Sequence, residues 1–328
     1  MALSGIALVT GGAGFIGSHL ASALVRAGVR VRIIDDLSTG NLKNLDEIGG
    51  AVEFIKGSIN DHDALNRAVR DVEIVFHEAA IPSVPRSIER PRETHEASVD
   101  GTFSLLLAAR DARVRRVIYA ASSSAYGDQP ESPKRESMRP DPLTPYAAAK
   151  LVGEYYCQVF TRSYGLETVS LRYFNVFGPR QDPSSPYSGV ISRFILALEH
   201  GERPIIYGDG AQTRDFTYVA NVVDANLRAA EAPAANGTVC NVANGESVSI
   251  NELFETLKRL TGRIDVTAEH AEARVGDVRD SLADLQTANR ILSYFPKIGL
   301  DEGLRLTLDW WQTSRFSSAQ DTQPQRQQ

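Results

Sequence analysis

The stretch TGGAGFIG, residues 10–17, decides the fold of this chain. It follows an apolar run at residues 6–9 and leads into residues 15–27, whose apolar positions have helical spacing. Glycines between a strand and a helix permit a tight turn, let backbone N–H groups approach a pyrophosphate, and let the helix pack closely on the sheet. The stretch therefore predicts a dinucleotide-binding turn. Its expected cofactor-binding residues are Gly11, Gly14, Phe15, Ile16 and Gly17.

Apolar runs alternate with helical segments through the first half of the chain. The further runs are residues 29–34, 52–55, 74–76, 117–119 and 169–171, and the helical segments are residues 63–69, 101–112 and 146–163. Runs that are apolar at every position fit strands buried on both faces. The alternation predicts an α/β fold with a doubly wound parallel (Rossmann) sheet that carries helices on both sides.

The alternation of apolar runs and helical segments ends near residue 177, where prolines and glycines interrupt it. We expect residues 1–177 and about 213–243 to form the nucleotide-binding domain. Residues of about 178–212 and 244–313 are expected to form a smaller mixed α/β domain that binds the substrate. The tail, residues 314–328, has almost no apolar content, and we expect it to be disordered.

Composition and charge exclude several classes of protein. The 328 residues are 42% hydrophobic and 23% charged, which is ordinary for a globular protein, and the net charge of −6 argues against nucleic acid or an anionic membrane as a partner. No apolar run approaches the roughly 20 residues that span a bilayer, and the start lacks a signal peptide, so we expect a cytoplasmic protein. Cys157 and Cys240 have no metal-ligand spacing around them, so we expect apolar fillers and no metal site.

An acid at the end of the second strand indicates which dinucleotide binds. Asp35 occupies the position where a carboxylate bonds the adenine ribose hydroxyls, and Asp36 follows it. Two carboxylates would repel a 2′-phosphate, so the sequence favours NAD over NADP. The alternative interpretation is that these acids lie in a solvated turn and bind no cofactor.

The segment TPYAAAK, residues 144–150, predicts the start of a helix, with Thr144 as N-cap and Pro145 in the first turn. Tyr146 and Lys150 are four residues apart and share a helix face. Lys150, the helix N-terminus and a bound nicotinamide cation would all favour the phenolate, which makes Tyr146 a candidate general base. Ser122, Ser123 and Ser124 follow the run at 117–119, at the edge of the sheet where ligands bind.

With these motifs, the chain resembles the extended short-chain dehydrogenase/reductase family, and within it the nucleotide-sugar 4-epimerases. The resemblance covers roughly residues 4–313. The motifs that carry it are TGGAGFIG (10–17), SSSAYGD (122–128), PYAAAK (145–150), RYFNVFGPRQ (172–181), YGDGAQTRDFTYV (207–219) and RVGDVRDSLAD (274–284).

The resemblance implies a role for each matching residue. Tyr146 is the expected base, Lys150 is expected to hold the nicotinamide ribose, and Ser122 is expected to bond the reacting hydroxyl. Further cofactor contacts are expected at Ser58 and Ile59, where the family has Asp before Ile. Arg214, Arg274 and Asp277 resemble the residues that hold the nucleotide diphosphate and its ribose; surface salt bridges are the alternative for the two arginines. The other expected substrate contacts are Ser123, Ser124, Asn175 and Ser281.

The resemblance also implies a reaction. Tyr146 would remove the proton of the 4-hydroxyl of a UDP-hexose while a hydride passes from C4 to tightly held NAD. The resulting 4-keto sugar would rotate in the site and take the hydride back on its opposite face. The expected partners are NAD and a UDP-sugar.

Competing functions make different demands on the same positions. A 4,6-dehydratase needs an acid pair where this chain has Ser123 and Ser124, and serine lacks a suitable pKa near pH 7. A decarboxylase has to recognise a sugar carboxylate, and the motifs contain no additional basic residue that suggests this. An NADPH reductase is disfavoured by Asp35 and Asp36. A noncatalytic nucleotide-sugar binder is the alternative from a different class.

Two finer expectations also come from the resemblance. The residue that sets the size of the sugar pocket corresponds to Ser281, and a small residue there admits an N-acetyl group, so UDP-GlcNAc and UDP-GalNAc are the expected substrates, with UDP-Glc and UDP-Gal as further candidates. The alternative for Ser281 is a small loop residue that does not set the size of the sugar pocket.

A homodimer is also expected from the resemblance, through the helices at residues 101–112 and 146–163.

Overall fold

The computed structural model describes residues 5–182, 189–273 and 278–320 of the chain. Its centre is a seven-stranded sheet in the order β11-β6-β5-β4-β1-β2-β3, in which every neighbouring pair is parallel. The strands are β1 (Ile6–Thr10), β2 (Arg30–Asp35), β3 (Val52–Lys56), β4 (Val72–His77), β5 (Arg116–Ser122), β6 (Glu167–Tyr173) and β11 (Thr238–Val242). The predicted doubly wound α/β fold is confirmed.

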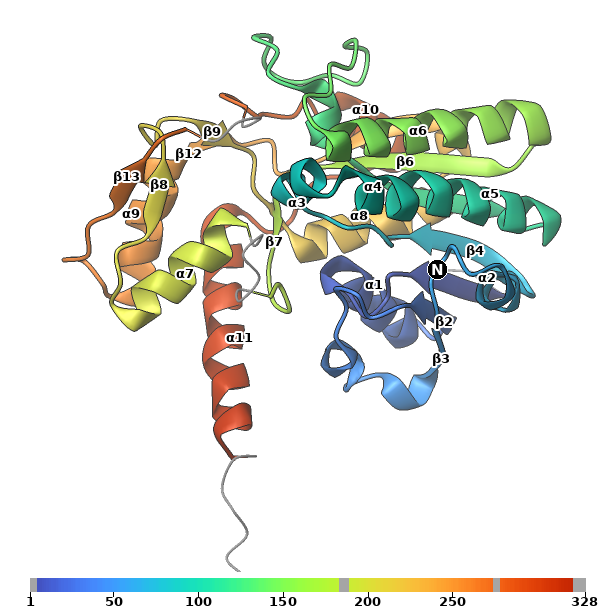
Figure 1. Ribbon diagram of the computed structural model, residues 1–328, viewed down its shortest axis with the longest axis horizontal. Helices are drawn as coiled ribbons and strands as arrows, with labels where there is room; N and C mark the ends of the chain where they lie inside the picture. The colour runs from blue at the N-terminus through green and yellow to red at the C-terminus, as the bar shows by residue number, and fades with distance from the viewer. Residues whose placement is uncertain (1–4, 183–188, 274–277, 321–328) are drawn as a thin grey trace, which may run out of the picture.

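Helices cover both faces of this sheet (Figure 1). One face packs on α1 (Phe15–Arg26), α8 (Val219–Glu231) and α10 (Gln286–Leu292), and the other on α2 (His62–Val69), α5 (Gly101–Asp111) and α6 (Pro145–Tyr164). Successive residues of β1 alternate between the two cores, Ala7 and Val9 in one and Leu8 in the other, because side chains of a strand point to opposite faces. Cys240 and Cys157 are buried and free in these two cores, as predicted.

A run of short helices follows β4 that the sequence did not predict. They are α3 (Val84–Glu89), α4 (Pro91–His95) and the π-helical turn η3 (Glu96–Asp100). Pro85 and Pro91 lie in the first turns of α3 and α4. A backbone N–H has no partner within the helix at this position, so the missing N–H of proline costs nothing, and the fixed φ of proline favours a helix start. The remaining single turns are η1 (Leu42–Leu45), η2 (Gly49–Ala51), η4 (Ser123–Tyr126) and η5 (Pro233–Ala235).

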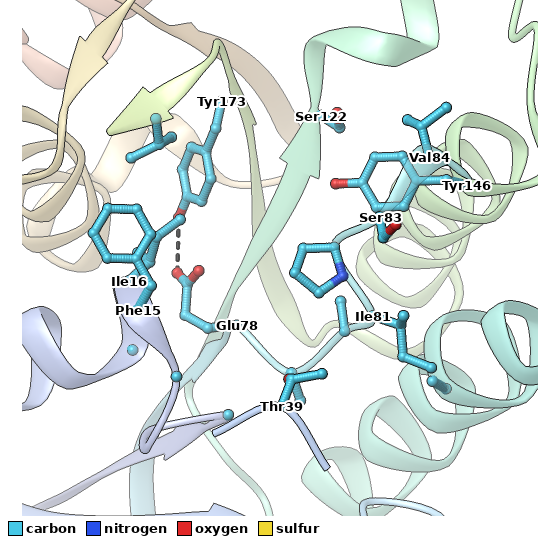
Figure 2. Close-up of a pocket in the computed structure, with 18 of the residues that line it drawn as sticks. Phe15, Ile16, Thr39, Glu78, Ile81, Ser83, Val84, Ser122, Tyr146 and Tyr173 are labelled. Atoms are coloured by element: carbon cyan, nitrogen blue, oxygen red, sulfur yellow. Dashed lines mark hydrogen bonds between the residues drawn. The ribbon is translucent and has the colours of Figure 1, made fainter. Parts of the chain in front are cut away.

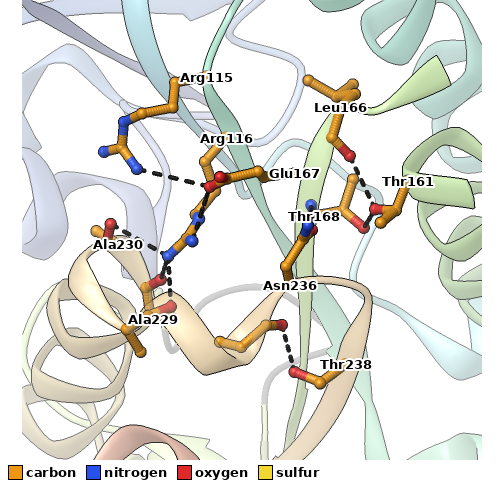
Figure 3. Close-up of polar contacts among 12 residues, drawn as sticks. Arg115, Arg116, Thr161, Leu166, Glu167, Thr168, Ala229, Ala230, Asn236 and Thr238 are labelled. Atoms are coloured by element: carbon orange, nitrogen blue, oxygen red, sulfur yellow. Dashed lines mark hydrogen bonds and ion pairs between the residues drawn. The ribbon is translucent and has the colours of Figure 1, made fainter.

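Arg116 connects the amino-terminal end of the sheet to the end of α8 (Figure 3). Its Nη1 donates to the carbonyls of Ala229 and Ala232, both at 2.8 Å, and its Nε donates to Glu167 at 2.8 Å. A cation that satisfies the last carbonyls of a helix also offsets the negative end of its dipole. This contact holds α8 against β5 and β6 at the edge opposite the candidate site.

A second lobe with its own core lies beside the carboxyl ends of the strands (Figure 1). Its helices are α7 (Val190–His200), α9 (Ile250–Thr261) and α11 (Leu300–Gln320). Its strands form three pairs: β7 (Val176–Phe177) with β10 (Thr217–Tyr218), β8 (Ile205–Tyr207) with β13 (Glu269–Ala271), and β9 (Thr213–Arg214) with β12 (Val248–Ser249). No helix in the described ranges is long and apolar enough to cross a membrane.

Several segments differ from the predicted division of the chain. Strands β7 and β10 pack in the second core through Phe177 and Tyr218, although both were assigned to the nucleotide-binding domain. Helix α10 returns to the first core, where Ala288 and Leu292 pack, although residues 244–313 were all assigned to the smaller domain. Helix α11 continues through residue 320, so the disorder predicted from residue 314 is wrong for 314–320. A helix that packing has already nucleated extends at little cost through residues without strong breakers.

Candidate active site

A cavity of about 1310 Å³ opens at the carboxyl ends of the central strands, against the second lobe. The walls of this cavity contain all the described residues that the sequence analysis predicted to bind cofactor or substrate or to act in catalysis, except Lys150. These lining residues are Gly11, Gly14, Phe15, Ile16, Gly17, Asp35, Asp36, Ser58, Ile59, Ser122, Ser123, Ser124, Tyr146, Asn175, Arg214 and Ser281. Arg274 and Asp277 lie outside the described residues.

The glycine turn leaves room for a diphosphate because side chains are excluded from it. A Cβ on Gly17 would lie 2.3 Å from the carbonyl oxygen of Gly11, and Gly11 itself has φ +67°. Helix α1 begins after Gly14, which offers no side chain to cap the first N–H groups. Uncapped N–H groups and the positive end of a helix dipole suit a pyrophosphate.

Asp35 is placed to receive ribose hydroxyls. Its Oδ2 accepts from the Ala13 N–H at 2.9 Å and its Oδ1 from the Leu37 N–H at 2.8 Å, so each oxygen keeps acceptor capacity toward the cavity. Burial raises the pKa of Asp35, and these two hydrogen bonds act against that rise. The turn and this carboxylate fit the adenosine end of NAD, with the exposed Asp36 beside them.

Helix α6 carries the candidate base in its first turn. The Ala147 N–H donates to Thr144 Oγ1 at 3.3 Å, and Pro145 opens the helix, as the sequence predicted. Tyr146 thereby reaches the cavity, while Lys150, one turn later, is buried. The Lys150 Nζ donates to the carbonyl of Ala120 at 2.7 Å, which fixes the position of the ammonium.

Burial shifts the pKa values of both members of this pair. Loss of water around the phenol raises the pKa of Tyr146, although its hydrogen bond with Ser122 lowers it; the nearby charge of Glu78 raises it further. Burial likewise lowers the pKa of Lys150 to about 8, against the raising effect of Glu78. In the protein without a bound cofactor, desolvation therefore outweighs the hydrogen bond with Ser122, and the phenol rather than the phenolate is favoured.

Ser122 is held in place by its neighbour. It ends β5, and its Oγ accepts from the Ser124 N–H at 3.2 Å and from the Ser124 hydroxyl at 2.8 Å. The Ser122 hydroxyl proton is then free to be donated elsewhere, and Tyr146 lies within its reach. Ser123 and Ser124 line the cavity beside it.

The second lobe contributes Arg214 and Ser281, and a single carboxylate organises them. Asp215 accepts backbone hydrogen bonds from Asn244, Gly245 and Ala283, and burial raises its pKa to about 6. The segment that carries Ser281 is thereby tied to the strand that carries Arg214.

Several cavity residues were missed by the sequence analysis. Glu78 follows β4 and Tyr173 ends β6, and Figure 2 shows them opposite Ser122 and Tyr146. Arg86 and Arg180 also line the cavity, but each is ion-paired, with Glu93 at 2.9 Å and Glu47 at 3.1 Å. The signal for Glu78 was present: it is an acid directly after an apolar strand, at the edge where ligands bind.

Comparisons with known proteins identify the family of the chain. Residues 7–243 match the model of the NAD dependent epimerase/dehydratase family. The solved UDP-N-acetylglucosamine 4-epimerase from Methanobrevibacter ruminantium, in complex with UDP-N-acetylmuramic acid, is 41% identical, with a TM-score of 0.90 over 94% of this chain and 99% of that one. The Thermus thermophilus UDP-glucose 4-epimerase, in complex with NAD, is 34% identical, with a TM-score of 0.87 over 94% and 99%. A UDP-N-acetyl-alpha-D-glucosaminuronate decarboxylase of Bacillus cytotoxicus is 33% identical over 314 residues, 93% of this chain and 97% of its own length.

Replacement of Asp35 tests the adenosine end of the site. Asp35→Asn removes the charged acceptor for ribose hydroxyls, and we expect the Kd for NAD⁺ to rise about tenfold. Asp36→Asn, at the exposed neighbour, is the matched control and should change the Kd less than about threefold. Calorimetric titration of the cofactor-free protein gives both values. Equal Kd values for wild type and Asp35→Asn would contradict the assignment.

Proposed function

The chain belongs to the NAD dependent epimerase/dehydratase family, and from that premise we propose that it is a UDP-hexose 4-epimerase. It is an NAD-dependent enzyme, and the 4-epimerases among its relatives are isomerases. The observation that carries the proposal is the composition of one cavity wall: Ser122 and Tyr146 come together there, and the adjacent positions 123 and 124 hold serines.

The chain's own residues perform the proton chemistry of the proposed reaction. Tyr146 takes the proton from the sugar's 4-hydroxyl, and Ser122 holds that oxygen by a hydrogen bond from its free proton. The Lys150 ammonium, fixed on the Ala120 carbonyl, stabilises the phenolate once the substrate is bound. NAD, when bound, supplies the reversible hydride acceptance that turns C4 into a ketone and back. Arg214 and Asn175 line the part of the cavity proposed for the diphosphate.

Each alternative reaction requires a group that is absent, or already bound elsewhere, among the described residues of the cavity. Elimination of water needs an acid beside the ketone, and Ser123 and Ser124 do not supply one near pH 7. Recognition of a sugar carboxylate needs a cation. Among the described residues of the cavity, the two additional arginines are held by Glu93 and Glu47, and the Lys134 ammonium donates to the carbonyls of Gln129 and Glu131. A binding protein without chemistry has no need of Tyr146 and Lys150 in this arrangement.

Ser281 supports N-acetylated sugars as the substrates. Its side chain is small, it lines the cavity, and its segment is fixed through the hydrogen bonds of Asp215. A small residue leaves space for a substituent at C2. We therefore propose UDP-GlcNAc and UDP-GalNAc as the principal pair, with UDP-Glc and UDP-Gal as smaller sugars that also fit.

Proton NMR of the purified protein tests the proposed reaction. With UDP-GlcNAc, and separately with UDP-glucose, the anomeric signal of the 4-epimer should appear without added NAD. Tyr146→Phe should reduce the rate by about 10²–10⁴-fold, because the proton acceptor is gone. A 4-keto-6-deoxy product would assign the chain to the dehydratases instead. Absence of any product, even with NAD added, would refute both activities for these sugars.

A larger residue at position 281 tests the sugar preference. Ser281→Tyr should suppress turnover of UDP-GlcNAc by about tenfold or more and spare UDP-glucose, because the added ring occupies the space of the N-acetyl group. Ser281→Ala is the matched control and should leave the ratio of the two kcat/KM values unchanged. Equal effects of the tyrosine on both sugars would contradict the proposal.

We also propose that the chain is a homodimer through α5 and α6. Their outer face exposes Phe103, Tyr155, Val159 and Tyr164, of which Tyr155 and Val159 are half exposed at 50% and 47%. Residues 155 and 159 are four apart on one helix and therefore share a face. An apolar face of this kind suits pairing with the same face of a second copy.

The mass in solution tests the dimer. Light scattering during size exclusion should give twice the chain mass of 35.8 kDa for the wild type. Val159→Glu should give the single-chain mass, because a charge would be buried at the interface. Ile264→Glu, at an exposed apolar residue of the second lobe, should leave the dimer intact. A monomeric wild type would contradict the proposal.

A further inference from the structure

The carboxyl group of Glu78 stands in the active-site cavity without a part in the proposed reaction. It is half-buried, directly after β4, and Figure 2 shows it facing Tyr173. The Tyr173 hydroxyl donates to Glu78 Oε1 at 2.8 Å and accepts from Asn226 Nδ2 at 2.8 Å. A chain of hydrogen bonds that starts on α8 therefore fixes the position of this carboxylate.

Glu78 lies between the two ends of the cofactor site. The next residue, Ala79, donates its N–H to Thr10 Oγ1 at 3.2 Å, and a Cβ on Gly11 would lie 2.8 Å from Ala79. The end of β4 is thus packed against the glycine turn. On the other side Glu78 acts electrostatically on Tyr146 and on Lys150. A dinucleotide that places its pyrophosphate on the turn and its reactive ring near Tyr146 has to pass along Glu78.

Among the residues that the structure describes, few other charges act on this carboxyl group. Helix α6 brings Lys150 and Tyr146, and β6 brings Tyr173. His77, the preceding residue, points away onto Thr10 and Thr102, and burial lowers its pKa to about 3, so that it stays neutral.

The uncharged neighbours complete the surroundings. Helix α1 contributes Phe15 and Ile16, and α8 contributes Asn226. Desolvation raises the pKa of Glu78 to about 7, while the Tyr173 hydrogen bond and Lys150 act to lower it. Lys150 is therefore the cation with which Glu78 interacts most directly among the described residues.

We propose that Glu78 is the charge partner of Lys150 and of the oxidised nicotinamide, and that it raises the affinity of the site for NAD⁺ relative to NADH. The oxidised ring carries a positive charge that the reduced ring lacks. With Lys150 protonated, NAD⁺ would place a second positive charge in a site shielded from water, which is unfavourable. The Glu78 carboxylate offsets one of them, and the benefit applies only to the oxidised form.

This inference rests on NAD binding and on the proposed places of Tyr146 and Lys150. It does not depend on which sugar the protein uses. Its consequence is that the resting protein holds NAD⁺, the form that can begin a cycle. Loss of the charge at residue 78 would let the reduced form accumulate.

The reduction potential of the bound cofactor tests the proposal without any sugar. The holoprotein is equilibrated with mediator dyes at pH 7, from which bound NAD⁺ takes two electrons and a proton, and NADH is read at its near-ultraviolet absorbance. Glu78→Gln preserves shape and the hydrogen bond from Tyr173. We expect it to favour NADH by about tenfold, a shift of about 30 mV to more positive potential for a two-electron couple.

Two further variants separate charge from structure. Glu93→Gln removes another carboxylate of the cavity wall, one already paired with Arg86, and should leave the potential unchanged. Tyr173→Phe removes the hydrogen bond that lowers the pKa of Glu78. Its potential should exceed that of the wild type at pH 7, and the difference should shrink as the pH is raised and the carboxyl group ionises in both proteins.

The outcomes decide the proposal. An unchanged potential in Glu78→Gln overturns it, as does an equal loss of affinity for NAD⁺ and NADH in calorimetric titration, which would mark a structural role. If the Gln variant is purified without cofactor, weakening confined to NAD⁺ supports the proposal. Failure of the proposed sugar chemistry would leave these measurements unaffected.

Discussion

The site depends on the close contact between the end of β1 and the start of α1. A Cβ at Gly17 would lie 2.3 Å from the Gly11 carbonyl oxygen, so this packing exists only because side chains are missing. The same contact leaves the first N–H groups of α1 uncapped and brings Ala13 to the Asp35 carboxylate. It also sets the distance to β4, because Gly11 packs on Ala79. The start of α1, the end of β2 and the end of β4 are thus positioned by one turn.

Work is divided between the two lobes. Under the proposed function, the sheet places the groups that transfer protons, with Ser122 at the end of β5 and Tyr146 in the first turn of α6. The second lobe supplies Arg214 and Ser281, which suit recognition of a substrate, and Asp215 binds their segments together. Specificity can therefore change in one lobe while the chemistry stays in the other.

Local patterns in the sequence were sufficient for most of the sheet and for the glycine turn, because buried strands and amphipathic helices have periodic signatures. Features that depend on distant contacts were missed. Helix α10 returns to the first core through packing that no local pattern records, and the short helices α3 and α4, which begin at prolines, were not predicted. The raised pKa of Tyr146 follows from desolvation, which only the assembled cavity reveals. Glu78 is a single acid without periodicity, and its partner Tyr173 is 95 residues away.

With serines at positions 123 and 124, the 4-keto sugar of the proposed function can react in one way only, which is reduction back to an alcohol. A protein that closes every other route accelerates both directions of one equilibrium and favours neither end. The ratio of the two sugars is then a property of the sugars in water, set by the free energy of an axial against an equatorial hydroxyl. Net flow through such a protein is decided by whichever later reaction consumes one of the two nucleotide sugars.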